Sequence, residues 1–284
     1  MPNLYATSDL HVTHQGNEHW LDAIRPATPE DWLLVAGDVA ERMSAVIETL
    51  ERLRERFATV VWVPGNHELW TTARDPDQHR GQDRYEELVR RCQSIGVLTP
   101  EDDFPVWQHA ARPLTIAPLF LLYDYSWRTP AAEGRPFAEA MEQARAAGVV
   151  CTDEFLLHAD PHASRAEWCA ARRELTEKRL AGIPAEHGTV LLSHWPLHRH
   201  PTEPLRYPEF VMWCGTQETA DWHVRYRAEV AVYGHLHIPR TTYRDGVRFE
   251  EVSLGYPREW RSRARGGVPM RRILTTDGQE AAAR

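Results

Sequence analysis

The sequence predicts a mixed α/β (α+β) fold. Short β-rich runs bounded by Gly, Pro or polar residues alternate with segments whose apolar residues recur every three or four positions. In addition, Asp, Asn and His residues follow directly or almost directly after several of the apolar runs. Sites in open α/β sheets gather beyond the carboxyl ends of strands. The same pattern therefore predicts a sheet and a cleft at one of its edges.

Seven runs have the composition of strands, and four segments have the spacing of helices. The strands are expected at 4–8, 32–36, 59–63, 115–122, 189–193, 229–233 and 247–254, and the helices at 43–57, 85–96, 164–181 and 218–227. The stretch at about 99–162 is rich in Pro, Ala and acidic residues. We interpret it as an irregular insertion over the core of a single domain spanning residues 1–284.

Composition excludes several classes of protein. The net charge of −8 argues against a general nucleic-acid binder, which would carry a basic excess. The apolar runs are far shorter than the roughly 20 residues of a membrane helix, and the N-terminus lacks the pattern of a signal peptide. The four cysteines show no CxxC spacing, which fits reduced thiols better than a disulfide framework or a structural zinc site. We expect a cytoplasmic protein that does not bind membranes.

Five short segments supply hard oxygen and imidazole donors. They read SDLH at 8–11, GDVAE at 37–41, GNHE at 65–68, SHW at 193–195 and GHLH at 234–237. Asp9 with His11, and His235 with His237, are spaced so that extended backbone places both side chains of a pair on one side. Asp38 has two carboxylate oxygens and could bridge two cations. The absence of thiolates favours Mn, Fe, Zn or Co over copper.

The order of these segments resembles the signature of the calcineurin-like metallophosphoesterase superfamily: DxH, GDxx, GNH[DE], H and GHxH. The resemblance implies a ββ sandwich flanked by helices and a dinuclear centre, with Mn and/or Fe as the expected metals and Zn or Co as alternatives. One metal would be held by Asp9, His11, Asp38 and His237, and the other by Asp38, Asn66, His194 and His235. His67 would remain unligated as the catalytic residue that protonates or stabilises the leaving oxygen.

Each segment alone is weak evidence, because GDV and GNHE are also common turn sequences and His194 beside Pro196 fits a core histidine. Their common order and their placement after strands favour the metal site. Glu41 is a candidate to orient His67, and Arg42 is a candidate to contact a phosphate oxygen. Both residues fit an exposed pair at a helix start equally well.

Other chemistries fit poorly. A serine hydrolase would need a GxSxG elbow, and none occurs in the sequence. A zincin protease would need HExxH, but His67 and Glu68 are followed by Leu69, Trp70 and Thr71. A protein of a different class, one that binds metal for regulation without catalysis, stays as an alternative. The presence of His67 favours the enzyme.

Longer runs look like those of the actinobacterial 4'-phosphopantetheinyl hydrolases, which remove the phosphopantetheine arm from carrier proteins. These runs are residues 7–17, 64–72, 117–125, 213–223, 233–242 and 255–260. The likeness implies hydrolysis of the phosphodiester of holo-acyl carrier protein, with acyl carrier protein as the partner. Cyclic-nucleotide phosphodiesterase, protein phosphatase and metabolite phosphatase stay as alternatives. GDVAER at 37–42 lacks the closing glycine of the protein-phosphatase pattern GDxxDRG, which counts against a protein phosphatase.

An arginine-rich segment at 256–272 allows two interpretations. Its arginines are Arg258, Arg261, Arg263, Arg265, Arg271 and Arg272, against Glu259 alone. The segment is either a solvated surface or a docking site for an acidic carrier protein, whose encounter it would steer.

Overall fold

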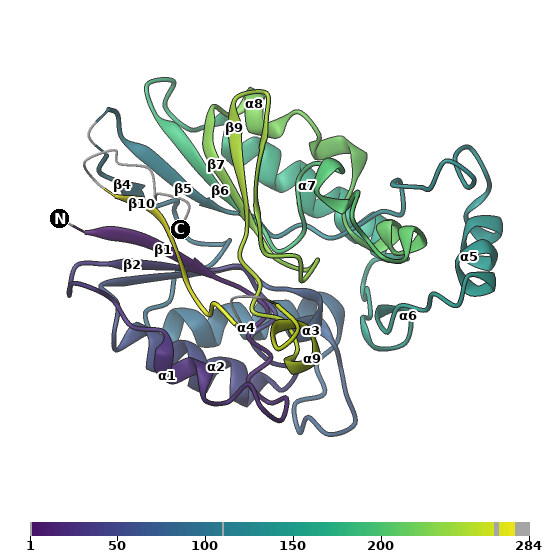
Figure 1. The fold of residues 1–284 in the computed structure, drawn as a ribbon, viewed down its shortest axis with the longest axis horizontal. Helices are drawn as coiled ribbons and strands as arrows, with labels where there is room; N and C mark the ends of the chain where they lie inside the picture. The colour runs from purple at the N-terminus through teal and green to yellow at the C-terminus, as the bar shows by residue number, and fades with distance from the viewer. Residues whose placement is uncertain (1, 110, 264–266, 276–284) are drawn as a thin grey trace.

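The computed structural model describes residues 2–109, 111–263 and 267–275, in which two β-sheets stack face to face (Figure 1). The first sheet has the order β10-β1-β2-β3, and the second has the order β4-β5-β6-β7-β9-β8. The strands are β1 (Asn3–Thr7), β2 (Trp32–Val35), β3 (Thr59–Trp62), β4 (Val106–Trp107), β5 (Leu114–Pro118), β6 (Gly188–Leu192), β7 (Ala228–Tyr233), β8 (Thr241–Arg244), β9 (Val247–Glu251) and β10 (Arg271–Thr275).

Helices cover the outer faces of both sheets, as Figure 1 shows for α1, α2 and α4 on one side and α7 and α8 on the other. The α-helices are α1 (Trp20–Ala23), α2 (Met43–Arg54), α3 (Asn66–Leu69), α4 (Gly81–Ser94), α5 (Phe137–Ala146), α6 (Asp153–Leu156), α7 (Arg165–Ala181), α8 (Trp222–Arg225) and α9 (Pro257–Trp260). Three 3-10 turns are η1 (His200–Thr202), η2 (Pro208–Trp213) and η3 (Gln217–Thr219). The expected ββ sandwich flanked by helices is confirmed.

Alternation along the strands explains the layers. In β2, Leu33 and Val35 join the buried cluster that includes α2 and α4, whereas Leu34 points into the cluster between the two sheets. Val190 of β6 lies in that same central cluster. Each fully buried aliphatic side chain contributes about 1.5–3 kcal/mol of hydrophobic free energy, so the two-sided burial of the strands fixes their register.

Parallel pairing aligns the strand ends that carry the candidate site. Strands β1, β2 and β3 are mutually parallel, and so are β5, β6, β7 and β9. A parallel bridge between Ser8 and Ser253, just beyond β1 and β9, joins the two sheets at this edge. The carboxyl ends of both sheets therefore meet at one place.

The structure corrects several expected elements. The run at 115–122 is a strand only as far as Pro118, and the run at 247–254 only as far as Glu251. The segment at 218–227 is not one helix, because it is divided between η3, which ends at Thr219, and α8, which begins at Trp222. The elements that were not expected are strands β4, β8 and β10, helices α1, α3, α5, α6 and α9, and the turns η1 and η2.

The stretch at about 99–162 is not wholly irregular. It contributes β4 and β5 to the second sheet, and it forms α5 and α6, which lie at the end of the molecule away from the N-terminus (Figure 1). Ala140, Met141 and Ala144 of α5 are buried. Their small or flexible side chains, set among acidic and alanine residues, concealed the helical periodicity.

All four cysteines are buried free thiols. In the part of the chain that the structure describes, every helix is too short or too polar to cross a membrane.

Candidate functional site

The expected ligands come together at the shared edge of the two sheets. Each one lies on the loop or short helix that follows the carboxyl end of a parallel strand. The side chains that meet there are Asp9, His11, Asp38, Asn66, His67, His194, His235 and His237. All are buried except His237, whose side chain is 14% exposed. The set is therefore a compact polar cluster at the end of an apolar sandwich.

Several of these residues have backbone in the left-handed region. Asp9 has a φ of 52°, Asp38 of 53° and His235 of 69°. Such conformations cost a non-glycine residue of the order of 1–3 kcal/mol and persist only where the surrounding structure enforces them. Neighbouring glycines make this room: a Cβ on Gly65 would lie 2.1 Å from Asp38 Oδ1, and one on Gly234 would lie 2.2 Å from Asp9 Oδ2. The glycines therefore let the carboxylates pack directly against backbone.

Asp38 occupies the centre of the cluster. Its Oδ2 atom lies 3.9 Å from Nε2 of His11, 3.8 Å from Nε2 of His67 and 3.5 Å from Nε2 of His194. Its Oδ1 atom accepts a hydrogen bond of 2.9 Å from the backbone N–H of His67. These distances from Oδ2 are longer than normal hydrogen bonds. They leave room for a cation bound by both the carboxylate oxygen and the imidazole nitrogens.

Asp9 and His237 form the second half of the cluster. Nε2 of His237 lies 2.9 Å from Asp9 Oδ1, and Nδ1 lies 2.6 Å from Glu259 Oε2. The Oγ of Ser253 donates to Asp9 Oδ2 at 2.9 Å. Burial alone would lower the pKa of His237, but the two carboxylates raise it well above its ordinary value. Burial would raise the pKa of Asp9, yet His237 and the other imidazoles hold it well below its ordinary value.

The donor set fits metal ions. His194 directs Nδ1 to the carbonyl of Ala36 at 2.7 Å and therefore presents Nε2 to the cluster. Metal-ligating histidines show this same division of roles between their two nitrogens. Nε2 of His235 is buried and has no hydrogen-bond partner among residues 2–109, 111–263 and 267–275. Burial and His194 also lower the pKa of His235, which keeps its ring in the neutral form that binds a cation.

Three overlapping groups in the described chain have the geometry to hold an ion. They are Asp9 with His11 and His237, His11 with Asp38 and His67, and Asp9 with Asp38 and His194. Asp9, His11 and Asp38 each belong to two of the three groups, so the groups form one continuous cluster of donors.

Two buried carboxylates that the sequence analysis missed hold the ligand loops. Glu68 accepts hydrogen bonds from the backbone N–H groups of Asp38, Val39 and Gly65 at 2.8–2.9 Å. Asp153 of α6 accepts from Nδ2 of Asn66 at 2.9 Å. Glu68 was visible in the GNHE segment, but its role depends on contacts with the preceding loop. Asp153 lies outside every motif.

His67 lies between the cluster and the side chains of Trp70 and Glu41. Its Nε2 faces Asp38, and its Nδ1 lies 3.4 Å from Oε1 of Glu41 and makes no hydrogen bond within the described part of the chain. The ring of Trp70 packs on it with 3.6 Å between centroids. Burial and the charge of His237 lower the pKa of His67 to about 3, so the imidazole is neutral at neutral pH. Glu41 therefore lies where an orienting group would be needed.

Arg42 lies elsewhere. Its exposed side chain lines a separate hollow together with Glu18 and Glu48 rather than the cavity at the metal cluster. The hypothesis that Arg42 contacts phosphate has no support from this placement.

A cavity of about 830 Å³ opens onto the cluster. Its floor includes Asp38, His67 and His235, and its outer part includes Arg206 and Arg258. Arg206 lies in the loop between η1 and η2, which no sequence motif singled out.

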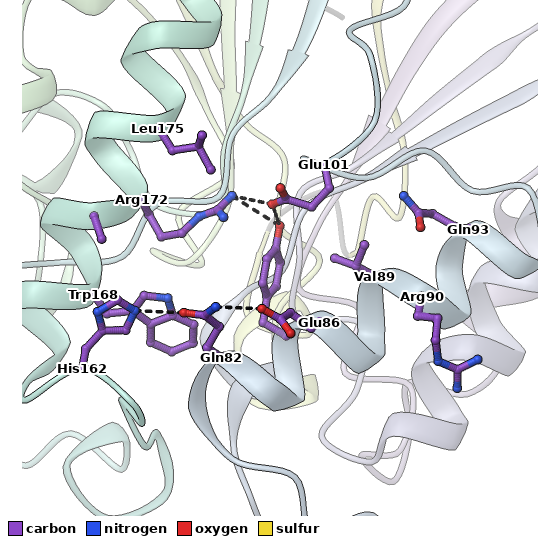
Figure 2. Close-up of a pocket in the computed structure, with 12 residues that line it drawn as sticks. Gln82, Glu86, Val89, Arg90, Gln93, Glu101, His162, Trp168, Arg172 and Leu175 are labelled. Carbon is purple, nitrogen blue, oxygen red and sulfur yellow. Dashed lines mark hydrogen bonds and ion pairs between the residues drawn. The ribbon is translucent and has the colours of Figure 1, made fainter.

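A second hollow lies between α4 and α7, away from the ligands (Figure 2). Arg172 reaches across it to Oε1 of Glu101 at 2.6 Å, and the hydroxyl of Tyr85 donates to the same oxygen. Its lining contains none of the expected site residues. Because the expected ligands lie elsewhere, we place the reaction site at the other cavity.

The model of the calcineurin-like phosphoesterase family matches residues 2–239. The chain belongs to the calcineurin-like phosphoesterase family. Among curated proteins it is 55% identical over 262 residues to the [acyl-carrier-protein] phosphodiesterase PptH of Mycobacterium tuberculosis, covering 92% of this chain and 80% of that protein. The crystal structure of phosphopantetheinyl hydrolase (PptH) from the same organism superposes with a TM-score of 0.92 and 53% identity over 96% of each chain.

Membership of this phosphoesterase family makes the chain a metal-dependent phosphoric ester hydrolase and implies divalent metal ions at the cluster. The alternative of a regulatory protein without catalysis is therefore set aside.

Proposed function

We propose that this phosphoesterase hydrolyses the phosphodiester that joins pantetheine to a serine of holo-acyl carrier protein, giving 4'-phosphopantetheine and the apo-protein. The observation that carries the proposal is the likeness to PptH, which extends over 92% of the chain and therefore far beyond the short ligand motifs. A likeness confined to the ligand segments would have supported only a generic phosphoesterase.

We infer that the ligands divide as the motif order implies. Asp9, His11, Asp38 and His237 would hold one cation, and Asp38, Asn66, His194 and His235 the other. We propose Mn and/or Fe as these metals, with Zn or Co as alternatives, because the donors are oxygen and imidazole nitrogen without thiolate. The four buried free cysteines of the chain suit a cytoplasmic enzyme.

The chain's own groups would act as follows. Cations at this site, when bound, would lower the pKa of the attacking water and neutralise the phosphate oxygens. His67 presents Nε2 to the cavity, where an imidazolium formed beside the anionic substrate would protonate the serine oxygen as it leaves, or a neutral ring with its proton on Nε2 would stabilise that oxygen by a hydrogen bond. Oε1 of Glu41 lies 3.4 Å from Nδ1 and would hold the ring in that orientation when the imidazole is protonated. Tyr256 and Trp70 enclose the imidazole and reduce the access of bulk water.

The direct test incubates the purified enzyme and Mn²⁺ with holo-acyl carrier protein and follows the protein mass, beside hydrolysis of a small aryl phosphodiester. We expect the carrier to lose the mass of the phosphopantetheine arm, and a chelator to stop both reactions until Mn²⁺ or Fe²⁺ is restored. Cleavage of the aryl diester with an unchanged carrier mass would refute the proposal and favour a nucleotide or metabolite phosphodiesterase.

A further inference from the structure

One wall of the cavity at the metal cluster is apolar. Leu205, Phe210 and Ile238 line it, and all three are partly buried hydrophobic residues that pack against the core cluster of the second sheet. Leu236 continues the same wall. Hydrolysis of a phosphate group does not require such a wall, because charged and hydrogen-bonding groups recognise phosphate. The wall therefore indicates a substrate with an apolar part close to its phosphate.

The wall begins directly at the expected ligands. The ring of Phe210 stacks on His235 with 5.8 Å between centroids and 22° between the planes. Leu236 and Ile238 alternate with the ligands His235 and His237 along the chain. An apolar group on the substrate would thus meet this wall within a few bonds of the phosphorus.

The geometry points to this wall, formed by Leu205, Phe210, Leu236 and Ile238, as the binding site for the pantetheine arm. This inference rests on the proposed function. In the arm, a carbon bearing two methyl groups follows the CH₂–O–P linkage, and two amides lie farther out. The methyl groups would contact Phe210, and the outer part of the arm would pass Leu205 and Ile238.

The size and the charge of the cavity agree with this occupant. Its volume of about 830 Å³ lies within the roughly 300–1,000 Å³ typical of sites for drug-sized ligands, far more than a phosphate group needs. Polar groups for the outer amides are available on Tyr207 and Ser262, which also line the cavity. Arg206 and Arg258 are exposed, so their guanidinium groups lie toward solvent, where the acidic carrier would remain.

The test compares Leu205→Asp with Leu175→Asp. Leu205 lies on the wall, whereas Leu175 is a 40% exposed residue of α7 beside the second hollow (Figure 2). Two measurements are made on each full-length enzyme: the affinity for unphosphorylated pantetheine, and the ratio of kcat/KM for holo-acyl carrier protein to kcat/KM for a small aryl phosphodiester. We expect Leu205→Asp to weaken pantetheine binding and to lower the ratio, each by about ten-fold or more, because a charged group replaces an apolar contact. Leu175→Asp should match the wild type.

The outcomes separate this inference from the proposed function. A wild-type enzyme that binds pantetheine through Leu205 but cleaves none of the carriers supplied would support the arm site and refute the carrier reaction. A wild-type enzyme that cleaves the carrier, with a Leu205→Asp variant that keeps both pantetheine affinity and the ratio, would overturn the arm site alone. Equal losses in Leu205→Asp and Leu175→Asp would also overturn it, because the effect would not depend on the wall.

Discussion

Nδ2 of Asn66 donates a 2.9 Å hydrogen bond to Oδ1 of Asp153, a fully buried carboxylate 87 residues farther along the chain. This contact orients the amide, so that Oδ1 of Asn66 lies 3.1 Å from Nε2 of His194 and faces the metal cluster. Trp70 and Tyr123 donate to the same carboxylate. The segment that looked like an insertion thus fixes one of the expected ligands.

We therefore expect Asp153→Leu to lower metal affinity by about 10- to 100-fold, the usual effect of removing a group that orients a ligand. The measurement is a metal titration, with thermal unfolding to confirm that the variant is folded. Tyr123→Phe is the matched control, because it removes one donor to Asp153 and keeps the bond to Asn66. A folded Asp153→Leu protein with wild-type affinity would show that the amide needs no such support.

His67 is expected to act on the leaving oxygen rather than to bind metal. His67→Ala should keep both metals and lose about 10²- to 10⁴-fold in kcat, the range of general acid–base help. His194→Ala should instead lose metal, because His194 directs Nε2 to Asp38. The structure also groups His67 with His11 and Asp38 as donors that could hold an ion. Loss of a metal from His67→Ala would assign His67 to the ligands.

Tyr256 contacts His67 from the side of the cavity. Its hydroxyl lies 3.4 Å from Nε2 of His67, and its ring stacks on His11 at 4.4 Å. Burial raises the pKa of Tyr256, so the hydroxyl keeps its proton. Tyr256→Phe retains the stacked ring and removes the hydroxyl. We expect kcat for a small diester to fall by about 3- to 10-fold, the value of one neutral hydrogen bond, with metal content unchanged. A wild-type kcat would exclude a role for the hydroxyl.

Glu41 and Arg42 are adjacent in sequence but lie in different places, which makes them a natural pair for comparison. Glu41→Gln should lower kcat several-fold and alter its dependence on pH, because Oε1 faces Nδ1 of His67. Arg42→Ala should leave kinetics unchanged, because its side chain lines another hollow. A fall in kcat of the same size for Arg42→Ala would indicate that both residues have a structural role at the start of α2.

The clustering of the candidate ligands was predictable because each of them belongs to a short local motif after an apolar run. The groups that support it were not. Ser253 and Glu259 follow no recognisable pattern, and only the pairing of β9 beside β7 and the position of α9 bring them to Asp9 and His237. Phe210 likewise reaches the cavity through the course of the loop that carries η2. Tertiary contacts decide the roles of these residues.

The strands that the sequence analysis missed have a similar explanation. Strand β10 carries Arg271 and Arg272 at its start, which gave it the appearance of a charged surface segment. In the structure Arg271 pairs with Glu250 of β9 at 3.0 Å, and Ile273 enters the core between the sheets. Only the presence of β1 as an antiparallel partner makes this segment a strand.

The described arginines of residues 256–272 differ in their contacts and exposure. Arg263 donates to the carbonyls of Leu254 and His237, and Arg271 is paired, so both are held by the fold. Arg265 lies outside the described residues. Arg258 lines the cavity with an 83% exposed side chain, and Arg206 lines it from the η1–η2 loop. The docking hypothesis therefore moves to Arg206 and Arg258.

We expect the double variant Arg206→Glu, Arg258→Glu to lower kcat/KM for holo-acyl carrier protein by at least ten-fold at low salt. At low salt the attraction between the arginines and an acidic partner is little screened and steers the encounter. The difference from wild type should shrink as salt rises, since the Debye length falls from about 30 Å at 0.01 M to about 8 Å at 0.15 M. Arg272→Glu, an exposed arginine of β10 outside the cavity lining, is the matched control and should change little. Hydrolysis of a small aryl phosphodiester is measured in parallel. Equal losses on both substrates would mean that the arginines maintain the cavity itself, and a salt-independent loss would contradict electrostatic steering.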